Sequence, residues 1–116
     1  PDDLWTVYFR SEEKEMTDRE IIKKYPFAEV YSIGGEALKY SWLELIPSVW
    51  AESFGEQMLE DLAKAIKRSG AGKVHIIDMK EKYGELRIQT DVYNEEIERV
   101  IDKYEKISRS IPCYRR

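Results

Sequence analysis

The chain has 116 residues, a length typical of one domain, and 42% of them are hydrophobic. We therefore expect one compact core and a single domain over residues 1–116. The formal net charge of -4 argues against a general phosphate-binding protein, which would show a basic stripe. The sequence has no apolar run of about 18 residues, the length that a membrane span needs. Cys113 is the single cysteine and cannot form an internal disulfide, which predicts a cytoplasmic protein.

The N-terminal part is predicted to contain a strand and a short helix. Residues Leu4–Phe9 are rich in β-branched and aromatic side chains, as in an edge strand. Thr17 and Glu20 have the spacing of a capping box, in which each side chain satisfies a free amide at a helix start. They predict a helix over about 18–24. Pro26 disfavours helical geometry at the preceding residue and ends it.

A connection and a longer helical region come next. Residues 27–40 show no clear period, so we expect an irregular connection with strand character at Glu29–Ser32. Residues at helical spacing then predict one or two helices over about 41–69. Two further residue pairs in this region have the spacing of a capping box: Ser41 with Glu44, and Ser53 with Glu56.

The clearest element is a β-hairpin over about 73–92, centred on Tyr83-Gly84. Residues 74–79 are mostly apolar, residues 86–90 alternate with period two, and Gly84 can adopt the positive φ of the turn. Alternation predicts that the inward side chains are Val74, Ile76, Leu86 and Ile88. The opposite face is predicted to carry His75, Ile77, Met79, Arg87 and Gln89. The apolar residues on that second face predict that it is partly covered too.

A last helix over about 95–110 completes the predicted fold. Asn94 is its expected cap, and Glu95 and Glu96 lie at the positive end of its dipole. Pro112 follows its end. We therefore predict an α+β protein in which a small antiparallel sheet, centred on the hairpin, packs against two or three main helices and a short N-terminal helix.

Two sets of residues on the hairpin are candidates for a binding site. The first is basic and aromatic and consists of Lys80, Lys82, Tyr83 and Arg87. In the alternative without a function, the Tyr83 ring packs under the turn while Lys80, Glu81 and Arg87 pair across the strands. Exposed ion pairs contribute little to stability. Stability alone is therefore a weak reason for so many charges, and a recognition role is the sharper hypothesis.

The second set consists of His75, Asp78 and Arg87 on the open sheet face. His75 is the only histidine, and its charge can change near neutral pH. It lies between two apolar strand residues without a nearby Ser or Cys nucleophile, which is more typical of a structural histidine. Asp78 and Glu81 lack the dense ligand spacing of a metal loop. No metal or cofactor is therefore expected, and a binding protein is favoured over an enzyme.

The hairpin tract M-K-E-K-Y-G-E-L-R-I over Met79–Ile88 resembles that of a family of small, uncharacterised bacterial and phage proteins. These carry V-K-E-K-F-G-x-L-R-F-Y, then a helix, a Ser-rich stretch and a C-x-x-C-G knuckle. Ile21–Pro26 and Trp42–Ile46 are similar to the family's early motifs. The resemblance implies no activity, but phage kinship implies a host-directed inhibitor or anti-defence factor. Arg116 stands where the knuckle would need a second cysteine, so a four-ligand structural zinc is not expected.

Three functional hypotheses follow from the sequence. The first is a small interaction protein that binds another protein through the hairpin turn and its flanking face. The second is a ligand-binding domain or small enzyme that uses the sheet face around His75. The third and weakest is nucleic-acid binding through a basic set of five residues: Lys80, Lys82, Arg87, Arg109 and Arg116. A homodimer could also form through an unpaired sheet edge at Leu86–Thr90 or Leu4–Phe9.

Overall fold

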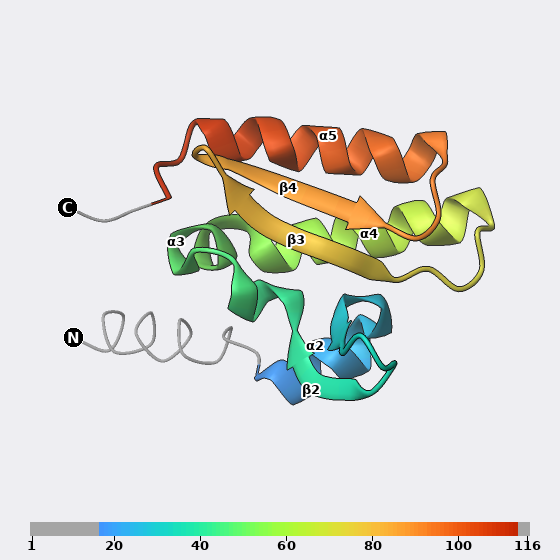
Figure 1. Cartoon of the computed structure of the whole chain (residues 1–116). Coiled ribbons are helices and arrows are strands. Elements are labelled where there is room, and N and C mark those ends of the chain that lie inside the picture. The colour runs from blue at the N-terminus through green and yellow to red at the C-terminus, as the bar shows by residue number, and fades with distance from the viewer. Residues whose placement is uncertain (1–16, 114–116) are drawn as a thin grey trace, which may run out of the picture.

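The computed structural model describes residues 17–113 (Figure 1). Its N-terminal part contains helix α2, one turn of 3-10 helix and a two-stranded antiparallel sheet. These elements are α2 (Asp18–Lys24), η1 (Pro26–Ala28), β1 (Glu29–Tyr31) and β2 (Ala37–Ser41). The predicted strand at Leu4–Phe9 lies outside the described residues.

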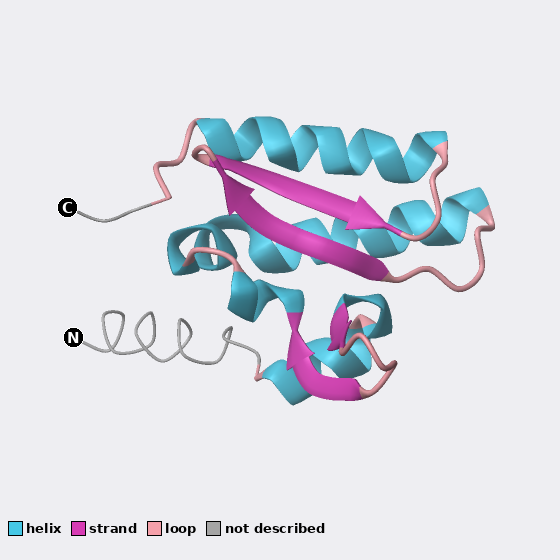
Figure 2. Ribbon diagram, in the orientation of Figure 1, coloured by secondary structure: helices cyan, strands magenta, loops and turns pink. Residues whose placement is uncertain are grey.

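The remaining elements form the larger part of the fold (Figure 2). They are the 3-10 helix η2 (Trp42–Leu45), α3 (Ser48–Trp50), the π-helical turn η3 (Ala51–Gly55), α4 (Glu56–Ser69), β3 (Ile76–Lys82), β4 (Glu85–Thr90) and α5 (Glu95–Arg109). The α3, η3 and α4 segments follow one another without a break. The predicted α+β class is confirmed, with two two-stranded antiparallel sheets among the described residues.

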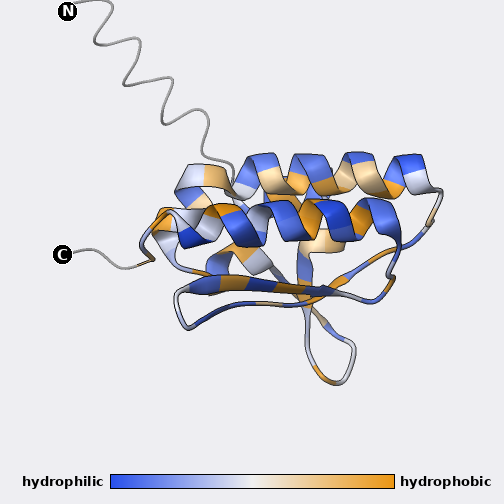
Figure 3. Cartoon of the chain, turned by 90° about the horizontal axis from the view of Figure 1, so that it is seen from above, coloured by the Kyte–Doolittle hydropathy of each residue, from blue (hydrophilic) through white to orange (hydrophobic). Residues whose placement is uncertain are grey.

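Helices α4 and α5 lie side by side and cover one face of the β3–β4 hairpin (Figures 1 and 3). The core fills the space between these two layers and extends toward α2 and α3. Its largest fully buried side chains include Trp50, Tyr25, Tyr104, Met58 and Met79. The opposite face of the hairpin is called the outer face below. No helix among residues 17–113 is long and apolar enough to cross a membrane.

A β-bulge changes which side chains of β3 point inward. Ile76 pairs with Thr90 but Asp78 pairs with Gln89, so β3 holds one extra residue, Ile77, at this point. The extra residue reverses the alternation, and Met79 points into the core at 1% exposure. The prediction that Met79 shares the outer face was therefore wrong. Ile77 does lie on the outside and is 49% exposed.

The predicted helix caps had mixed outcomes. Thr17 and Glu20 form the capping box of α2, and the Asn94 side chain accepts a 2.9 Å hydrogen bond from the Ile97 amide at the start of α5. The pair Ser41 and Glu44 does not form a box, because the Ser41 hydroxyl instead donates to Asp18 Oδ1 at 3.0 Å. Ser53 and Glu56 form none either. They lie inside the continuous helical segment that starts after Pro47, where backbone amides already have helical partners.

Part of the region predicted as irregular forms the second hairpin. Strand character at Glu29–Ser32 is confirmed for β1, but β2 over Ala37–Ser41 was not predicted. The turn between them is closed by the Ser32 amide, which donates to the Glu36 carbonyl at 2.9 Å, and by Gly35 at a φ of +88°. Strand β2 begins with three exposed residues in a row, so inward and outward side chains do not alternate along it and its sequence carries no period-two signal.

Side chains of α5 occupy the free edge of β4. The Leu86 amide donates to Ser108 Oγ at 2.9 Å, and the Ile88 amide donates to Glu105 Oε2 at 3.1 Å. These amides point away from β3 and would be the donors that a second copy needs for pairing. The structure therefore does not support the predicted homodimer through Leu86–Thr90.

Candidate functional site

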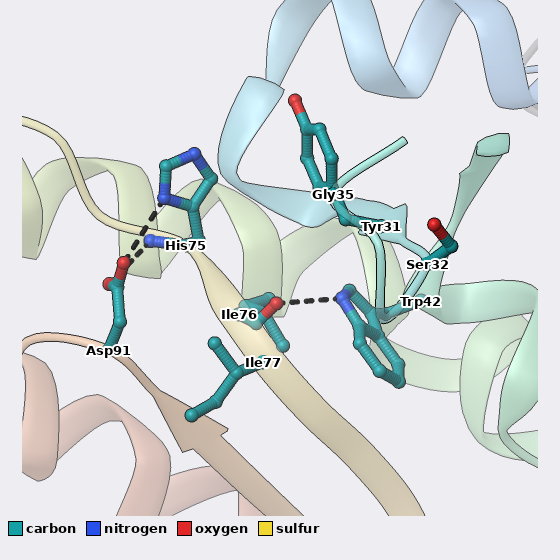
Figure 4. A pocket seen from close by; sticks show the side chains of 8 residues that line it. All are labelled: Tyr31, Ser32, Gly35, Trp42, His75, Ile76, Ile77 and Asp91. Atoms are coloured by element: carbon teal, nitrogen blue, oxygen red, sulfur yellow. Dashed lines mark hydrogen bonds and ion pairs between the residues drawn. The ribbon is translucent and has the colours of Figure 1, made fainter. Parts of the chain in front are cut away.

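The outer face of the hairpin carries one candidate site at each of its two ends. One end is the turn with Lys80, Lys82, Tyr83 and Arg87. The other is a pocket of about 440 Å³ between the β1–β2 turn and the start of β3 (Figure 4). Its lining residues are Tyr31, Ser32, Gly35, Trp42, His75, Ile76, Ile77 and Asp91. This volume is in the usual range for small-molecule sites.

At the hairpin turn, Tyr83 is the most exposed aromatic side chain of the described residues, at 90%. Its φ of +55° and that of Gly84, +78°, are those of a two-residue type I′ turn. The Gly84 amide donates to Glu81 Oε2 at 2.7 Å and stabilises this turn. The alternative in which the Tyr83 ring packs under the turn was therefore wrong, because the side chain is exposed to solvent.

The basic residues flank this turn on the outer face. Lys80 lies directly opposite Arg87 in the register of the two strands, so the predicted attraction across the strands is replaced by a pair of like charges. Each contacts a carboxylate on its own strand, Lys80 with Asp78 at 3.5 Å and Arg87 with Glu85 at 3.7 Å. Lys82 Nζ lies 5.9 Å from the centre of the Tyr83 ring.

At the pocket, His75 is held by one carboxylate. Asp91 accepts from the His75 amide at 2.7 Å with Oδ1, and its Oδ2 is 3.1 Å from Nδ1 of the His75 ring. Partial burial raises the pKa of Asp91, but the hydrogen bonds and charge of His75 outweigh it and leave that pKa below the ordinary value. Asp91 is thus an ionised acceptor that orients the ring.

Aromatic and aliphatic side chains form the rest of the pocket. The Tyr31 ring meets the His75 ring edge to face, with centroids 5.8 Å apart. Trp42 lies across the pocket from His75 in Figure 4. Its indole N–H donates to the Ile76 carbonyl at 2.8 Å. Ile77 reaches the pocket because the bulge turns it outward. The pocket thus combines apolar walls with an oriented imidazole.

The alternative set of His75, Asp78 and Arg87 is not brought together as a unit. Asp78 and Arg87 have other partners, and the register places Arg87 opposite Lys80. That position is roughly 15 Å along the strand from His75, at about 3.3 Å per residue. The carboxylate beside His75 is Asp91, which sequence reasoning missed. Counting residues outward from the Tyr83-Gly84 turn along both strands would have placed Asp91 near His75, at the open end of the hairpin.

Two other kinds of site, one for a metal ion and one for nucleic acid, were considered from the sequence. Within residues 17–113, no group of three or more His, Cys, Asp or Glu side chains is placed to hold a metal ion. Arg109 of the predicted nucleic-acid set contacts Glu85 at 3.2 Å, and Arg116 lies outside the described residues. The outer face therefore mixes both signs of charge, unlike the basic tracks that bind phosphate backbones.

Comparisons of the chain with protein-family models, with curated proteins and with solved structures found no match. The resemblance of the hairpin tract to bacterial and phage proteins therefore stays a prediction, and the function has to be argued from the site.

Proposed function

We propose that this chain is a small interaction module that binds another protein through the turn and outer face of the β3–β4 hairpin. The observation that carries the proposal is Tyr83, a fully solvated aromatic residue in a turn position that does not favour it.

Folding alone gives no reason for a tyrosine at this position. Type I′ turns favour Asn-Gly, because a residue with a β-carbon resists positive φ while Asn tolerates it. Since 90% of Tyr83 is exposed, its ring adds little buried surface in return. Tyrosine is enriched at the centres of protein interfaces, where an amphipathic ring supplies both apolar area and a hydrogen bond.

The charges next to the turn support the same role in protein binding. Directly opposed like charges such as Lys80 and Arg87 destabilise a hairpin slightly, and exposed ion pairs with Asp78 and Glu85 offset only part of that. Two cations and a tyrosine on one exposed face suit an acidic patch on a partner protein. If the resemblance to phage proteins holds, that partner is a host protein, and the chain acts as an inhibitor or anti-defence factor.

Tyr83→Asn tests the proposal because it is expected to change stability and binding in opposite directions. Asn fits the turn, so the free energy of unfolding should rise by about 0.5 kcal/mol, as measured by urea denaturation. Proteins retained by the immobilised parent chain would be purified, and their dissociation constants measured by calorimetry. The proposal predicts that Tyr83→Asn and the double variant Lys80→Glu, Arg87→Glu each weaken binding roughly tenfold or more.

The matched control reverses two exposed cations on α4, Lys64→Glu with Lys67→Glu, and should bind like the parent. Equal affinity of Tyr83→Asn and the parent would refute the proposal. So would failure of the parent chain to form a defined complex with any retained protein.

A further inference from the structure

The turn of the β1–β2 hairpin carries an aliphatic side chain that is completely exposed to solvent. Ile33, at 109% exposure, is the most exposed large hydrophobic residue of the described chain. It directly precedes Gly34 and Gly35. Turns favour small and polar residues, so local folding gives no reason for an isoleucine here. Removal of this side chain from water by another surface would be favourable.

An apolar pocket lies at the base of the same turn. It has a volume of about 440 Å³, and Ser32, the neighbour of Ile33 in the sequence, is one of its lining residues. Trp42 and Ile77 supply apolar walls, and Ile77 is 49% exposed. Nε2 of His75 is on the ring edge turned away from these two walls (Figure 4). This side of the pocket therefore suits an aliphatic group, which needs no hydrogen bond.

The turn also carries hydrogen-bond donors that suit the polar part of the pocket. The amides of Ile33 and Gly34 have no acceptor among residues 17–113. Asp91 uses each of its oxygens once, for His75, and an ionised carboxylate has about four acceptor positions. The Tyr31 hydroxyl has no partner in the same part of the chain and can donate or accept. The polar capacity left in the pocket thus matches a turn with free amides.

The turn and the pocket together have the shape of a hook. The β1–β2 turn projects away from helices α4 and α5, past the outer face of the main hairpin (Figure 3). The pocket lies in the angle between this turn and the start of β3. Two such hooks related by a two-fold axis can interlock, because the tip of each then meets the base of the other. In such an isologous contact one surface supplies both halves.

We propose that this chain forms a two-fold dimer in which Ile33 of each copy lies in the pocket of the other, between Trp42 and Ile77. The occupant is a second copy because an apolar tip and an apolar pocket that fits it are adjacent on one surface, which makes that surface self-complementary. The contact uses neither the β4 edge nor the turn around Tyr83. It therefore stands apart from the protein interaction proposed above.

Sedimentation of the pure chain up to millimolar concentration tests the dimer, and the parent should show a monomer–dimer equilibrium. Ile33→Ser removes the apolar tip and leaves the pocket intact. Burial of one such side chain corresponds to about tenfold in affinity and each dimer buries two, so the dissociation constant should rise about a hundredfold. The matched control Leu45→Ser removes a half-exposed aliphatic side chain outside the pocket and should dimerise like the parent.

A mixture of two variants separates this contact from non-specific association. Ile77→Lys places a charge in the pocket wall and keeps the tip, and circular dichroism would confirm that it and Ile33→Ser are folded. The mixture restores one tip in one intact pocket, so the two variants should bind each other more tightly than either binds itself. In mixed dimers of labelled and unlabelled parent chain, nuclear Overhauser contacts should join the Ile33 methyl groups of one copy to the Trp42 ring of the other.

Two results would overturn the proposal. The first is a parent chain that stays monomeric at millimolar concentration, which would leave the pocket to a small molecule or to another protein. The second is a dimer that Ile33→Ser does not weaken, because another surface would then join the copies. Tyr83→Asn should leave the dimer unchanged, so failure here is distinguishable from failure of the hairpin interaction.

Discussion

Two buried tyrosines attach other helices to α4 through single hydrogen bonds. Tyr25 donates its hydroxyl hydrogen to Glu60 Oε1 at 2.6 Å, and Tyr104 donates to Asp61 Oδ2. Burial raises the pKa of both tyrosines, and the adjacent carboxylates raise it further. Both therefore remain protonated donors at all pH values at which the protein is handled, and each carboxylate keeps its partner.

Tyr104→Phe removes one of these bonds without removing the ring. We expect a loss of about 1 to 2 kcal/mol in the free energy of unfolding at pH 7, measured by urea denaturation. Partial burial raises the pKa of Asp61, but hydrogen bonds from Tyr104, Lys103 and Gln57 outweigh it and lower that pKa overall.

The lowered pKa of Asp61 determines how the stability loss of Tyr104→Phe depends on pH. A depressed carboxyl pKa stabilises the fold above the unfolded value of about 3.9, and that stabilisation is lost as pH falls through the lower, folded value. The difference between the parent and Tyr104→Phe should therefore shrink at pH 2 to 3. The control Tyr93→Phe changes an exposed tyrosine and should alter stability little at either pH. A pH-independent difference for Tyr104→Phe would contradict the role of Asp61.

At the scale of elements, α5 completes the β4 edge that lacks a neighbouring strand. Ser108 is fully buried, accepts from the Leu86 amide and donates to the Glu105 carbonyl at 2.6 Å. Glu105 itself accepts from the Ile88 amide. Helix α5 thus covers the sheet with its apolar stripe and also satisfies two strand donors, which a hairpin alone would leave unpaired.

Ser108→Ala would leave the buried Leu86 amide without its acceptor. We expect a loss of about 1 to 3 kcal/mol in stability and faster hydrogen exchange at the Leu86 amide. The matched control is Ser110→Ala, because Ser110 also donates to a carbonyl of α5, at 2.8 Å, but is exposed. Equal effects of the two variants would show that the edge contact contributes nothing beyond an ordinary surface hydroxyl.

At the scale of the whole molecule, single polar contacts link elements that lie far apart in the sequence. Trp42 reaches the Ile76 carbonyl, and Tyr25 reaches Glu60. Near the start of α2, Asp18 accepts from both the amide and the hydroxyl of Ser41. Glu44 lies close to the same carboxylate, which raises the pKa of Glu44 through a shared hydrogen bond and charge repulsion, with a smaller effect of burial.

Glu44→Gln is expected to relieve this repulsion. A raised carboxyl pKa means that the stabilising protonated form is present below the unfolded value of about 4.3 and is lost as pH rises through the folded value. The variant should therefore gain up to about 0.5 kcal/mol at pH 7 and nothing at pH 3, by urea denaturation. Glu36→Gln, on the exposed β1–β2 turn, is the control. A destabilised Glu44→Gln at pH 7 would contradict the repulsion.

Much of the secondary structure could be predicted because its signals are local. The capping residues Thr17 and Asn94 and the turn glycine Gly84 act within a few residues of themselves. The same holds for the apolar stripes of α4 and α5, which repeat along one helix face. Lys80, Lys82, Tyr83 and Arg87 were correctly assigned to one hairpin for the same reason.

The chain's sequence alone thus determined the fold class, the main hairpin and the basic residues around its turn. Tertiary structure alone decided three features of the candidate sites: the bulge at Ile77, the outward position of Tyr83 and the contact between His75 and Asp91. Each depends on strand register and on what packs against the sheet. A shift of one residue in strand register moves every following side chain to the opposite face of the sheet. The packing of the whole core selects the register, rather than residues that are neighbours in the sequence.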